Sequence, residues 1–303
     1  MKVSALQLHN YIGNKESSFS ASETLIQKAA SEGSKLVALP ELSTCGYIPN
    51  EGIWKYGEKS DGVTAQWACR MAKKYSLHIG AGYLETDERE FYNTYLIASP
   101  EGKIKGQVRK TRAESYCFKS SNIGNVIKTE IGKIAIGICA DNHELWFYDK
   151  LSSLDFDLLL MPHAWATPYT SGKYVQPDDI TDSKHNVDTL GSIYASGFGV
   201  PVIFINSVGE VPPMRGILGK FMSPDYFRLQ GGSAVFQPDG TAMRIEGSNE
   251  QVITSEIELG HKKMMSDKPA IYQGWLHPGS WLSRKVIIPL DRAFGSYYYR
   301  KHH

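Results

Sequence analysis

The sequence predicts an α/β layered fold whose sheet is not purely parallel. Along its 303 residues, apolar or alternating strand-like segments take turns with amphipathic helical segments, as layered α/β folds require. Some strand-like segments come in pairs around a tight turn, Pro-Glu-Gly at 100–102 and Pro-Asp-Gly at 238–240, which indicates antiparallel hairpins. Since no internal repeat or low-complexity linker divides the chain, we expect a single domain over residues 1–260 and a C-terminal extension over 261–303.

The expected elements follow this alternation. Strand-like segments, apolar or alternating and bounded by turn residues, lie at 2–8, 35–40, 77–84, 91–108 (a hairpin), 125–139 (two strands), 157–162, 200–208, 231–247 (a pair) and 251–259. Helical segments with a 3.6-residue apolar period lie at 20–33, at 61–76, from about 144 and near 184–197. Residues 209–230, rich in Gly, Pro and Met, predict a long loop, and the pattern weakens from 261 into a Trp/Tyr-rich tail.

Composition excludes several classes of protein. With 33 Lys+Arg against 32 Asp+Glu and no basic stripe, the chain has no strong field for nucleic acid or an anionic membrane. It has neither a signal-peptide pattern at its start nor an apolar run as long as a membrane helix. The four cysteines do not form a disulfide framework, and the absence of a Cys-x-x-Cys pair argues against structural zinc. We therefore expect a cytoplasmic protein with reduced thiols that binds neither nucleic acid nor membrane.

Cys139 is the most informative residue. It ends the apolar, β-rich run KIAIGIC and is followed by a small residue and a carboxylate, an arrangement that presents a thiol at the end of a buried strand. Taken alone, such a cysteine is usually a small buried hydrophobe. A catalytic role requires activation by a nearby lysine or carboxylate base and, for a thiolate at neutral pH, a lowered pKa.

Two charged residues stand upstream in similar settings. Glu41 follows the apolar run LVAL and a proline, and Lys110 lies in RKTR after a strand-like segment. Each is, alone, most simply a solvated charge at a strand end. Together with the thiol they form a set able to break an amide-type C–N bond: a general base, a cation for the developing oxyanion and a nucleophile.

In this chain order the residues resemble the nitrilase, or carbon–nitrogen hydrolase, superfamily. The resemblance rests on LPEL with a following GY, RK, and GICAD, at spacings of 69 and 29 residues between Glu41, Lys110 and Cys139. Further segments resemble landmarks of the family: KVSALQL, the YN of FYNTYLI, LLLMPHAW and GGSAVFQPDG. The resemblance therefore covers about residues 1–259. The resemblance implies a four-layer α-β-β-α sandwich that pairs through its outer helices as a homodimer or higher homo-oligomer.

The resemblance also implies roles. Cys139 would be the nucleophile, Glu41 the general base and Lys110 the stabiliser of the tetrahedral intermediate. Glu114 would be the supporting second carboxylate, and the backbone N–H of Ala140 would complete the oxyanion site. A linear amide or a carbamoyl (ureido) compound would lose ammonia or an amine and leave a thioester that water hydrolyses, with no metal or organic cofactor.

Departures from the family pattern limit the classes of substrate that we expect. Thr111-Arg112 replaces the common His-Leu after the lysine. Separately, Glu114 lies only four residues after Lys110, closer than the family pattern leads us to expect. Ala140 and the carboxylate after it do not resemble the Cys-Trp-Glu of nitrile-cleaving members, so nitrile hydrolysis is disfavoured. The arginines by which carbamoyl-amino-acid members grip a carboxylate are replaced by Asn-His, although Arg112 is an alternative contact from another loop.

Pocket residues and rival functions complete the prediction. Tyr47, His163 and Trp165 are candidate substrate contacts, because aromatic-lined pockets with a few polar groups are the usual design. One rival is a papain-like dyad of Cys139 and His163, which would leave the placement of Glu41 and Lys110 unexplained. The other rival is a catalytically inactive binding protein that retains the scaffold, against which the intact Glu/Lys/Cys set argues.

Overall fold

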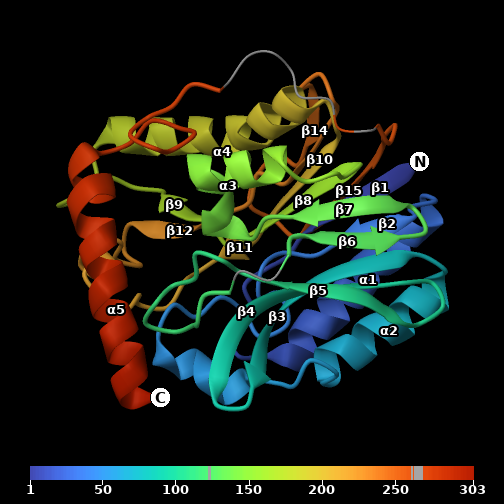
Figure 1. The fold of residues 1–303 in the computed structure, drawn as a ribbon, viewed down its shortest axis with the longest axis horizontal. Coiled ribbons are helices and arrows are strands. Elements are labelled where there is room, and N and C mark those ends of the chain that lie inside the picture. Colours follow the sequence, from blue (N-terminus) through green and yellow to red (C-terminus); the bar gives the residue numbers. More distant parts are fainter. Residues whose placement is uncertain (122–123, 261, 263–268) are drawn as a thin grey trace.

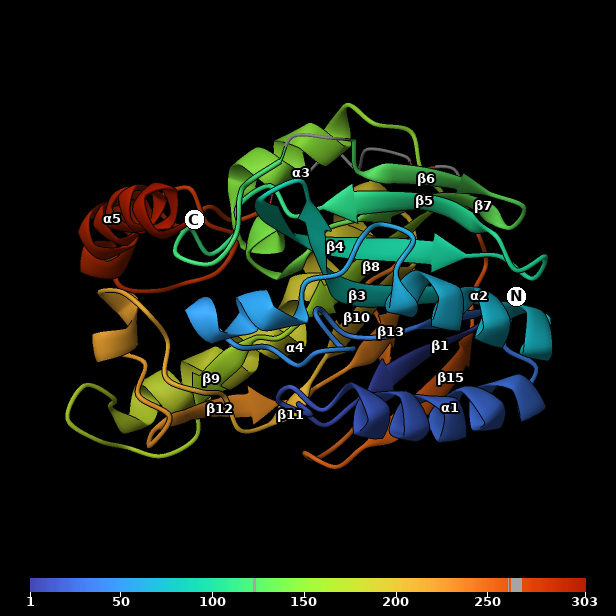
Figure 2. The same ribbon diagram turned by 90° about the horizontal axis from the view of Figure 1, so that it is seen from below.

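The computed structural model describes residues 1–121, 124–260, 262 and 269–303 as one four-layer sandwich. Two six-stranded sheets pack face to face in its middle, and a pair of helices covers each outer face (Figures 1 and 2). The predicted α-β-β-α architecture is confirmed. None of the described helices combines the length and the apolar character needed to cross a bilayer.

The first sheet has the order β15-β1-β2-β3-β4-β5. Its strands are β1 (Lys2–Gln7), β2 (Leu36–Ala38), β3 (His78–Asp87), β4 (Glu90–Ala98), β5 (Ile104–Arg109) and β15 (Gln251–Glu256). β1, β2 and β3 are parallel, whereas β15, β4 and β5 join antiparallel at the two sides. The sheet is therefore mixed, as the hairpin signals predict.

The second sheet repeats this plan in the order β14-β13-β10-β8-β7-β6. Its strands are β6 (Val126–Thr129), β7 (Gly132–Ile136), β8 (Leu158–His163), β10 (Val202–Asn206), β13 (Ala234–Phe236) and β14 (Ala242–Arg244). Here β7, β8 and β10 are the parallel strands. Parallel strands place their carboxyl ends at one edge of a sheet, so the segments that follow β7 and β8 are neighbours.

Side chains alternate along the strands and so build three apolar layers. On β10, Ile203 and Ile205 face the other sheet, whereas Val202 and Phe204 pack beneath the helices. The outer helices are α1 (Lys15–Ser31), α2 (Val63–Tyr75), α3 (Leu145–Ser152) and α4 (Pro177–Phe198). Two of them begin earlier than predicted. Asn14 caps α1 by accepting a hydrogen bond from Ser17 N at 3.0 Å, and a capping box at Gln176 starts α4.

The segment predicted as a long loop, 209–230, has structure of its own. A third, three-stranded sheet joins β11 (Val208–Gly209), β12 (Phe227–Gln230) and β9 (Ala166–Pro168), and a 3₁₀ turn covers Leu218–Lys220. The segment is therefore a loop over much of its length, as predicted, but a short 3₁₀ turn and a strand interrupt it. Strands this short carry too few residues for a period-2 pattern to emerge.

The described part of the C-terminal extension contains a helix that the sequence pattern did not predict. A π-helical turn, Ser283–Ile287, leads into α5 (Ile288–His302), which lies along one end of the sandwich (Figures 1 and 2). Phe91 N donates to Tyr299 Oη at 2.9 Å, and Leu218 N donates to Asp291 Oδ1 at 3.0 Å. The helix thus packs on its own chain, beside the loops at the strand ends.

Candidate active site

Glu41 lies buried in the turn that follows β2, with only 1% of its surface exposed. Its Oε1 accepts hydrogen bonds from Asn93 Nδ2 and from Lys110 Nζ, each at 2.7 Å. Its Oε2 accepts a hydrogen bond from the backbone N–H of Ala164, which follows β8, at 2.8 Å. Donors from both sheets therefore hold one carboxylate at the edge where the parallel strands end.

Lys110 follows β5 directly and is fully buried. Besides Glu41, its Nζ donates to Glu114 Oε1 at 2.8 Å and to Oε2 at 3.1 Å. Tyr47 Oη donates to the same Glu114 Oε1 at 3.1 Å. One ammonium thus lies between two carboxylates, and the structure brings together Glu41, Lys110, Glu114 and Tyr47 as predicted neighbours.

Cys139 follows β7 at the start of a 3₁₀ turn, Cys139–His143, and is 8% exposed. Its φ of +46° lies in the left-handed region, which costs a non-glycine residue about 1–3 kcal/mol and is enriched at functional sites. A Cβ on Gly137, two residues before it, would lie 1.9 Å from Asn142 Oδ1 and 2.5 Å from Phe147. Only glycine therefore fits directly after β7, where the chain passes close to Asn142 and Phe147 before it reaches the thiol.

Asp141 joins the cysteine turn to the lysine turn. Its carboxylate accepts hydrogen bonds from Arg112 N at 2.7 Å and from Thr111 N at 3.1 Å. Complete burial raises its pKa to about 6, although these two N–H groups and Lys110 act in the opposite direction. The carboxylate after the cysteine therefore fixes the distance between the segments that carry the thiol and the ammonium.

Burial and neighbouring charges set the ionisation of the group. Burial first, and then Glu114, raise the pKa of Glu41 above its ordinary value in spite of Lys110. Burial alone would lower the pKa of Lys110, but Glu114 and Glu41 hold it well above the ordinary value. Burial and the Glu41 charge raise the pKa of the Cys139 thiol well above normal, while Lys110 pulls it down. The lowered thiol pKa considered in the sequence analysis is therefore absent, and the resting thiol keeps its proton beside a carboxylate able to accept one.

A histidine cluster lies on the other side of the thiol. One ligand atom from each of Cys139, His143 and His163 lies within 4.8 Å of the other two. Trp165 packs edge-on against His143, with ring centroids 4.2 Å apart, and His143 in turn meets His277. Burial lowers the pKa of His163 to about 3 and that of His277 to about 4, so these imidazoles are neutral.

Ala140, Tyr47 and Glu114 line a cavity of about 150 Å³ that lies beside the charged group. Arg112, Arg215 and Arg292 also line it, together with Trp275 from the C-terminal extension. Arg292 Nη2 lies 2.6 Å from Glu144 Oε1, and Arg112 Nη1 lies 3.6 Å from Glu144 Oε2. The cavity therefore has a mixed wall of aromatic, cationic and anionic groups, part of which belongs to residues beyond 260.

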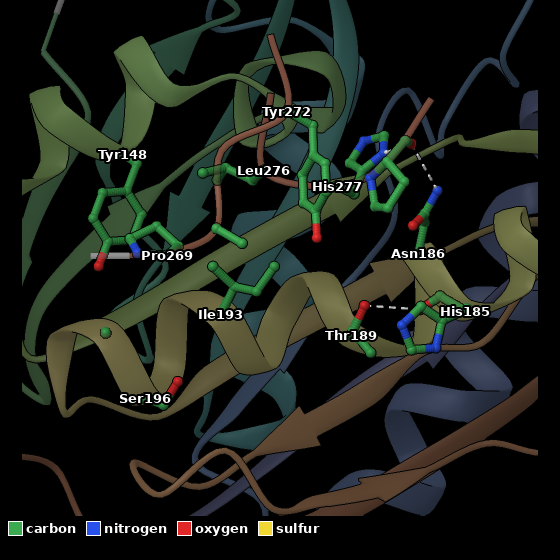
Figure 3. A pocket seen from close by; sticks show the side chains of 13 residues that line it. Tyr148, His185, Asn186, Thr189, Ile193, Ser196, Pro269, Tyr272, Leu276 and His277 are labelled. Carbon is green, nitrogen blue, oxygen red and sulfur yellow. Dashed lines mark hydrogen bonds between the residues drawn. The ribbon is translucent and has the colours of Figure 1, made fainter. Parts of the chain in front are cut away.

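A larger cavity, of about 560 Å³, lies between α4 and the C-terminal extension. Figure 3 shows Asn186 and Ile193 on α4 facing Tyr272 and His277. Asn186 Nδ2 donates to Pro278 O at 3.4 Å across its end. This cavity is separate from the one beside Ala140, but His277 links it to the histidines next to Cys139.

Sequence reasoning missed several contributors to this site. Asn93 stands in the YN landmark but had no role, although its position on β4, opposite the turn of Glu41, makes it a hydrogen-bond donor. His143 was given no role, and His277 lies in the extension, where no pattern was visible. Only the three-dimensional meeting of separate strand ends brings these side chains to the thiol.

The fold is similar to that of solved carbon–nitrogen hydrolases and amidases. The structure superposes on a carbon–nitrogen hydrolase from Helicobacter pylori G27 with a TM-score of 0.72 at 20% identity, covering 85% of this chain and 89% of that one. A mutant amidase of the nitrilase superfamily from Nesterenkonia AN1 superposes with a TM-score of 0.67 at 15% identity, covering 84% and 89%. Both show the same sandwich.

The family follows from the sequence comparison. The chain belongs to the carbon–nitrogen hydrolase family, whose model matches residues 2–262. Among named relatives, the human omega-amidase NIT2 is 27% identical over 251 residues, which cover 78% of this chain and 81% of that protein. A nitrilase from Pyrococcus abyssi is 28% identical over 180 residues, 56% of this chain and 67% of that protein. The predicted superfamily is confirmed.

Proposed function

We propose that the protein hydrolyses the C–N bond of a small linear amide or carbamoyl (ureido) compound through a thioester on Cys139. The observation that carries the proposal is the buried pair of Glu41 and Lys110, joined by the partly exposed Glu114, at the strand edge where Cys139 turns. Charged groups are expensive to bury, and functional sites are where proteins bury them. The amidases among the relatives and solved structures support an amide substrate.

In the proposed mechanism Glu41 removes the thiol proton as Cys139 sulfur attacks the carbonyl carbon. The raised pKa of Glu41 makes it a better proton acceptor than an ordinary glutamate. Lys110 and the backbone N–H of Ala140 stabilise the oxyanion, and Glu114 keeps the lysine in place.

Collapse of the intermediate breaks the C–N bond, and the leaving nitrogen takes the proton from Glu41. Glu41 then takes a proton from water, the resulting hydroxide attacks the thioester, and the carboxylic or carbamic acid leaves as the thiol is restored.

The site disfavours the papain-like dyad. In such a dyad the imidazole accepts the thiol proton, yet burial lowers the pKa of His163 to about 3 and makes it a poor base. The Nδ1 of His163 is occupied by the Met161 carbonyl oxygen at 2.7 Å. We assign His163, Trp165 and Tyr47 to the walls of the substrate site instead.

The cavity beside Ala140 supports a small substrate, since about 150 Å³ admits a molecule of a few heavy atoms and no polymer. We further propose a homo-oligomer, because α5 exposes a row of apolar side chains, Leu290, Phe294 and Tyr297, of the kind that marks interaction surfaces. A cytoplasmic location fits the four free cysteines, which a reducing compartment preserves.

The proposal is tested by measuring ammonia release from primary amides, N-carbamoyl compounds and nitriles. The measurement compares wild type with Cys139→Ala and Cys69→Ala. Cys69 lies on α2 and serves as the matched thiol control. We expect release from amides or carbamoyl compounds that disappears only in Cys139→Ala. Equal release by wild type and Cys139→Ala would refute the mechanism, and no release from any substrate would favour the inactive binding protein.

A further inference from the structure

His143 and His163 take no part in the chemical steps of the proposed mechanism, yet with the thiol of Cys139 they form a set of metal-binding groups. Cys139, His143 and His163 each have a potential ligand atom within 4.8 Å of the other two, and all three side chains are buried. Within the described ranges, no other three His, Cys, Asp or Glu side chains are placed so that they could hold one cation together. A thiolate with two imidazoles is a donor set suited to zinc and related cations.

His163 presents an unused lone pair. Its Nδ1 lies 2.7 Å from the carbonyl oxygen of Met161, which can only accept, so this nitrogen carries the ring proton. The other nitrogen, Nε2, is therefore unprotonated, and it is buried without a hydrogen-bond partner in the described part of the chain. A fully buried, unpartnered acceptor is costly unless something occupies it.

His143 is oriented by a second histidine. Its Nδ1 lies 2.9 Å from His277 Nε2, and the Nδ1 of His277 lies 3.1 Å from the carbonyl oxygen of Pro278. If that carbonyl accepts the proton of His277, then His277 Nε2 accepts from His143, and Nε2 of His143 is free to bind a cation.

The opposite tautomer, in which Arg284 Nη2 donates to His277 Nδ1, would rest on a longer contact of 3.3 Å. Metal-binding histidines ordinarily donate their second N–H to just such a carbonyl or neighbouring acceptor.

We propose that Cys139, His143 and His163 form a three-ligand site for Zn²⁺ or a similar borderline-soft divalent cation, with a fourth position open to a water molecule. Tetrahedral zinc needs these ligand atoms about 3.4–3.6 Å apart, so closing the site from within 4.8 Å takes a small rotation of the side chains. On binding, the thiol proton leaves to solvent and the sulfur coordinates as thiolate. The two carboxylates and one ammonium of Glu41, Glu114 and Lys110 leave a net negative charge nearby, which favours a cation.

The consequence for catalysis rests on the proposed function. A sulfur that coordinates Zn²⁺ cannot attack a carbonyl carbon, so the cation acts as a reversible inhibitor that competes for the nucleophile. The cavity wall contributed by His277 (Figure 3) then supports the metal site from the C-terminal extension.

The test uses the full-length protein after chelator treatment, titrated with Co²⁺ for its spectrum and with Zn²⁺ against a chromophoric chelator. We expect one equivalent of each, and a thiolate-to-cobalt charge-transfer band with the d–d bands of a tetrahedral ion. The band should disappear in each of the three ligand variants, Cys139→Ala, His143→Ala and His163→Ala. It should remain in two control variants, Cys69→Ala and His185→Ala, which alter a half-exposed thiol and an exposed imidazole. Binding that none of the first three variants changes, or no charge-transfer band in wild type, would overturn the site.

Two measurements keep the test valid if a variant folds poorly. Wild-type protein alkylated at Cys139 should lose the cobalt band with its fold intact, and His277→Ala should weaken Zn²⁺ binding about 10–100-fold by releasing His143. Unchanged Zn²⁺ affinity in both would contradict the assignment. Because these readouts need no substrate, failure of ammonia release with intact metal binding would refute the proposed function alone, and the converse result would refute the metal site alone.

Discussion

Lys110→Met tests how the buried charges are balanced. Lys110 donates to Glu41 at 2.7 Å and to Glu114 at 2.8 and 3.1 Å, with no surface exposed. The methionine keeps the volume but leaves two carboxylates facing each other. Removing one partner of a buried ion pair costs about 3–5 kcal/mol of unfolding free energy.

The penalty should depend on pH with a defined sign. In the variant one carboxylate takes up a proton, so its folded pKa exceeds the unfolded value of about 4.3, and stability falls as pH rises through that interval. Between pH 6 and 8 the loss should grow by up to about 2.7 kcal/mol, or about 1.4 kcal/mol per pH unit.

Guanidinium unfolding at both pH values measures the effect, with Lys103→Met, an exposed lysine, as the control that changes stability by less than about 0.5 kcal/mol. Adding Glu114→Gln to Lys110→Met should restore part of the loss. A penalty below about 1 kcal/mol that does not vary with pH would refute this account of the charges.

Burial holds the pKa of His163 at about 3 and that of His277 at about 4, so the folding stability that is present above about pH 6.5 is lost as the pH falls towards these values. The urea midpoint of His163→Gln should therefore fall less between pH 7 and 5 than that of wild type, and an equal fall would contradict the neutral imidazole. Because the pKa of the Cys139 thiol is raised, its alkylation rate by iodoacetamide should reach half-maximum above the ordinary thiol value of about 8.5, and a midpoint near 7 would show a preformed thiolate. Tyr299→Phe should lower the free energy of unfolding by about 1 kcal/mol because it removes the acceptor of Phe91 N, and Tyr299→Ala by about 3 kcal/mol because it also leaves a cavity. Thermal unfolding measures both losses, and equal losses would contradict the packing of α5.

The fold was largely predictable because its strands are long enough to show their pattern. Residues 200–208 form one apolar run because β10 is buried on both faces, between the first sheet and the outer helices. The helix starts at Lys15 and Pro177 were missed because a single cap at Asn14 or Gln176 decides them, and the apolar period begins later. α5 was missed because the face that it buries against distant loops carries Asp291, Gly295 and Tyr299, which do not form an apolar stripe.

The candidate site was predictable only where it follows strand ends. Glu41, Lys110 and Cys139 each close a strand-like segment, and the parallel topology brings such ends together. Asn93 lies within a strand and His277 in the extension, so neither position indicates a contact with the charged group or the thiol. The raised pKa of the thiol was equally hidden, because it depends on burial and on the Glu41 charge.

The most direct test of the proposed mechanism is acid quenching during turnover, followed by mass measurement of the intact chain and of its peptides. We expect a mass increase equal to that of the acyl or carbamoyl group. It should be confined to the peptide that contains Cys139, be removed by hydroxylamine and be missing in Cys139→Ala. Turnover without this adduct in wild type and undiminished in Cys139→Ala, or an adduct on another residue, would contradict it.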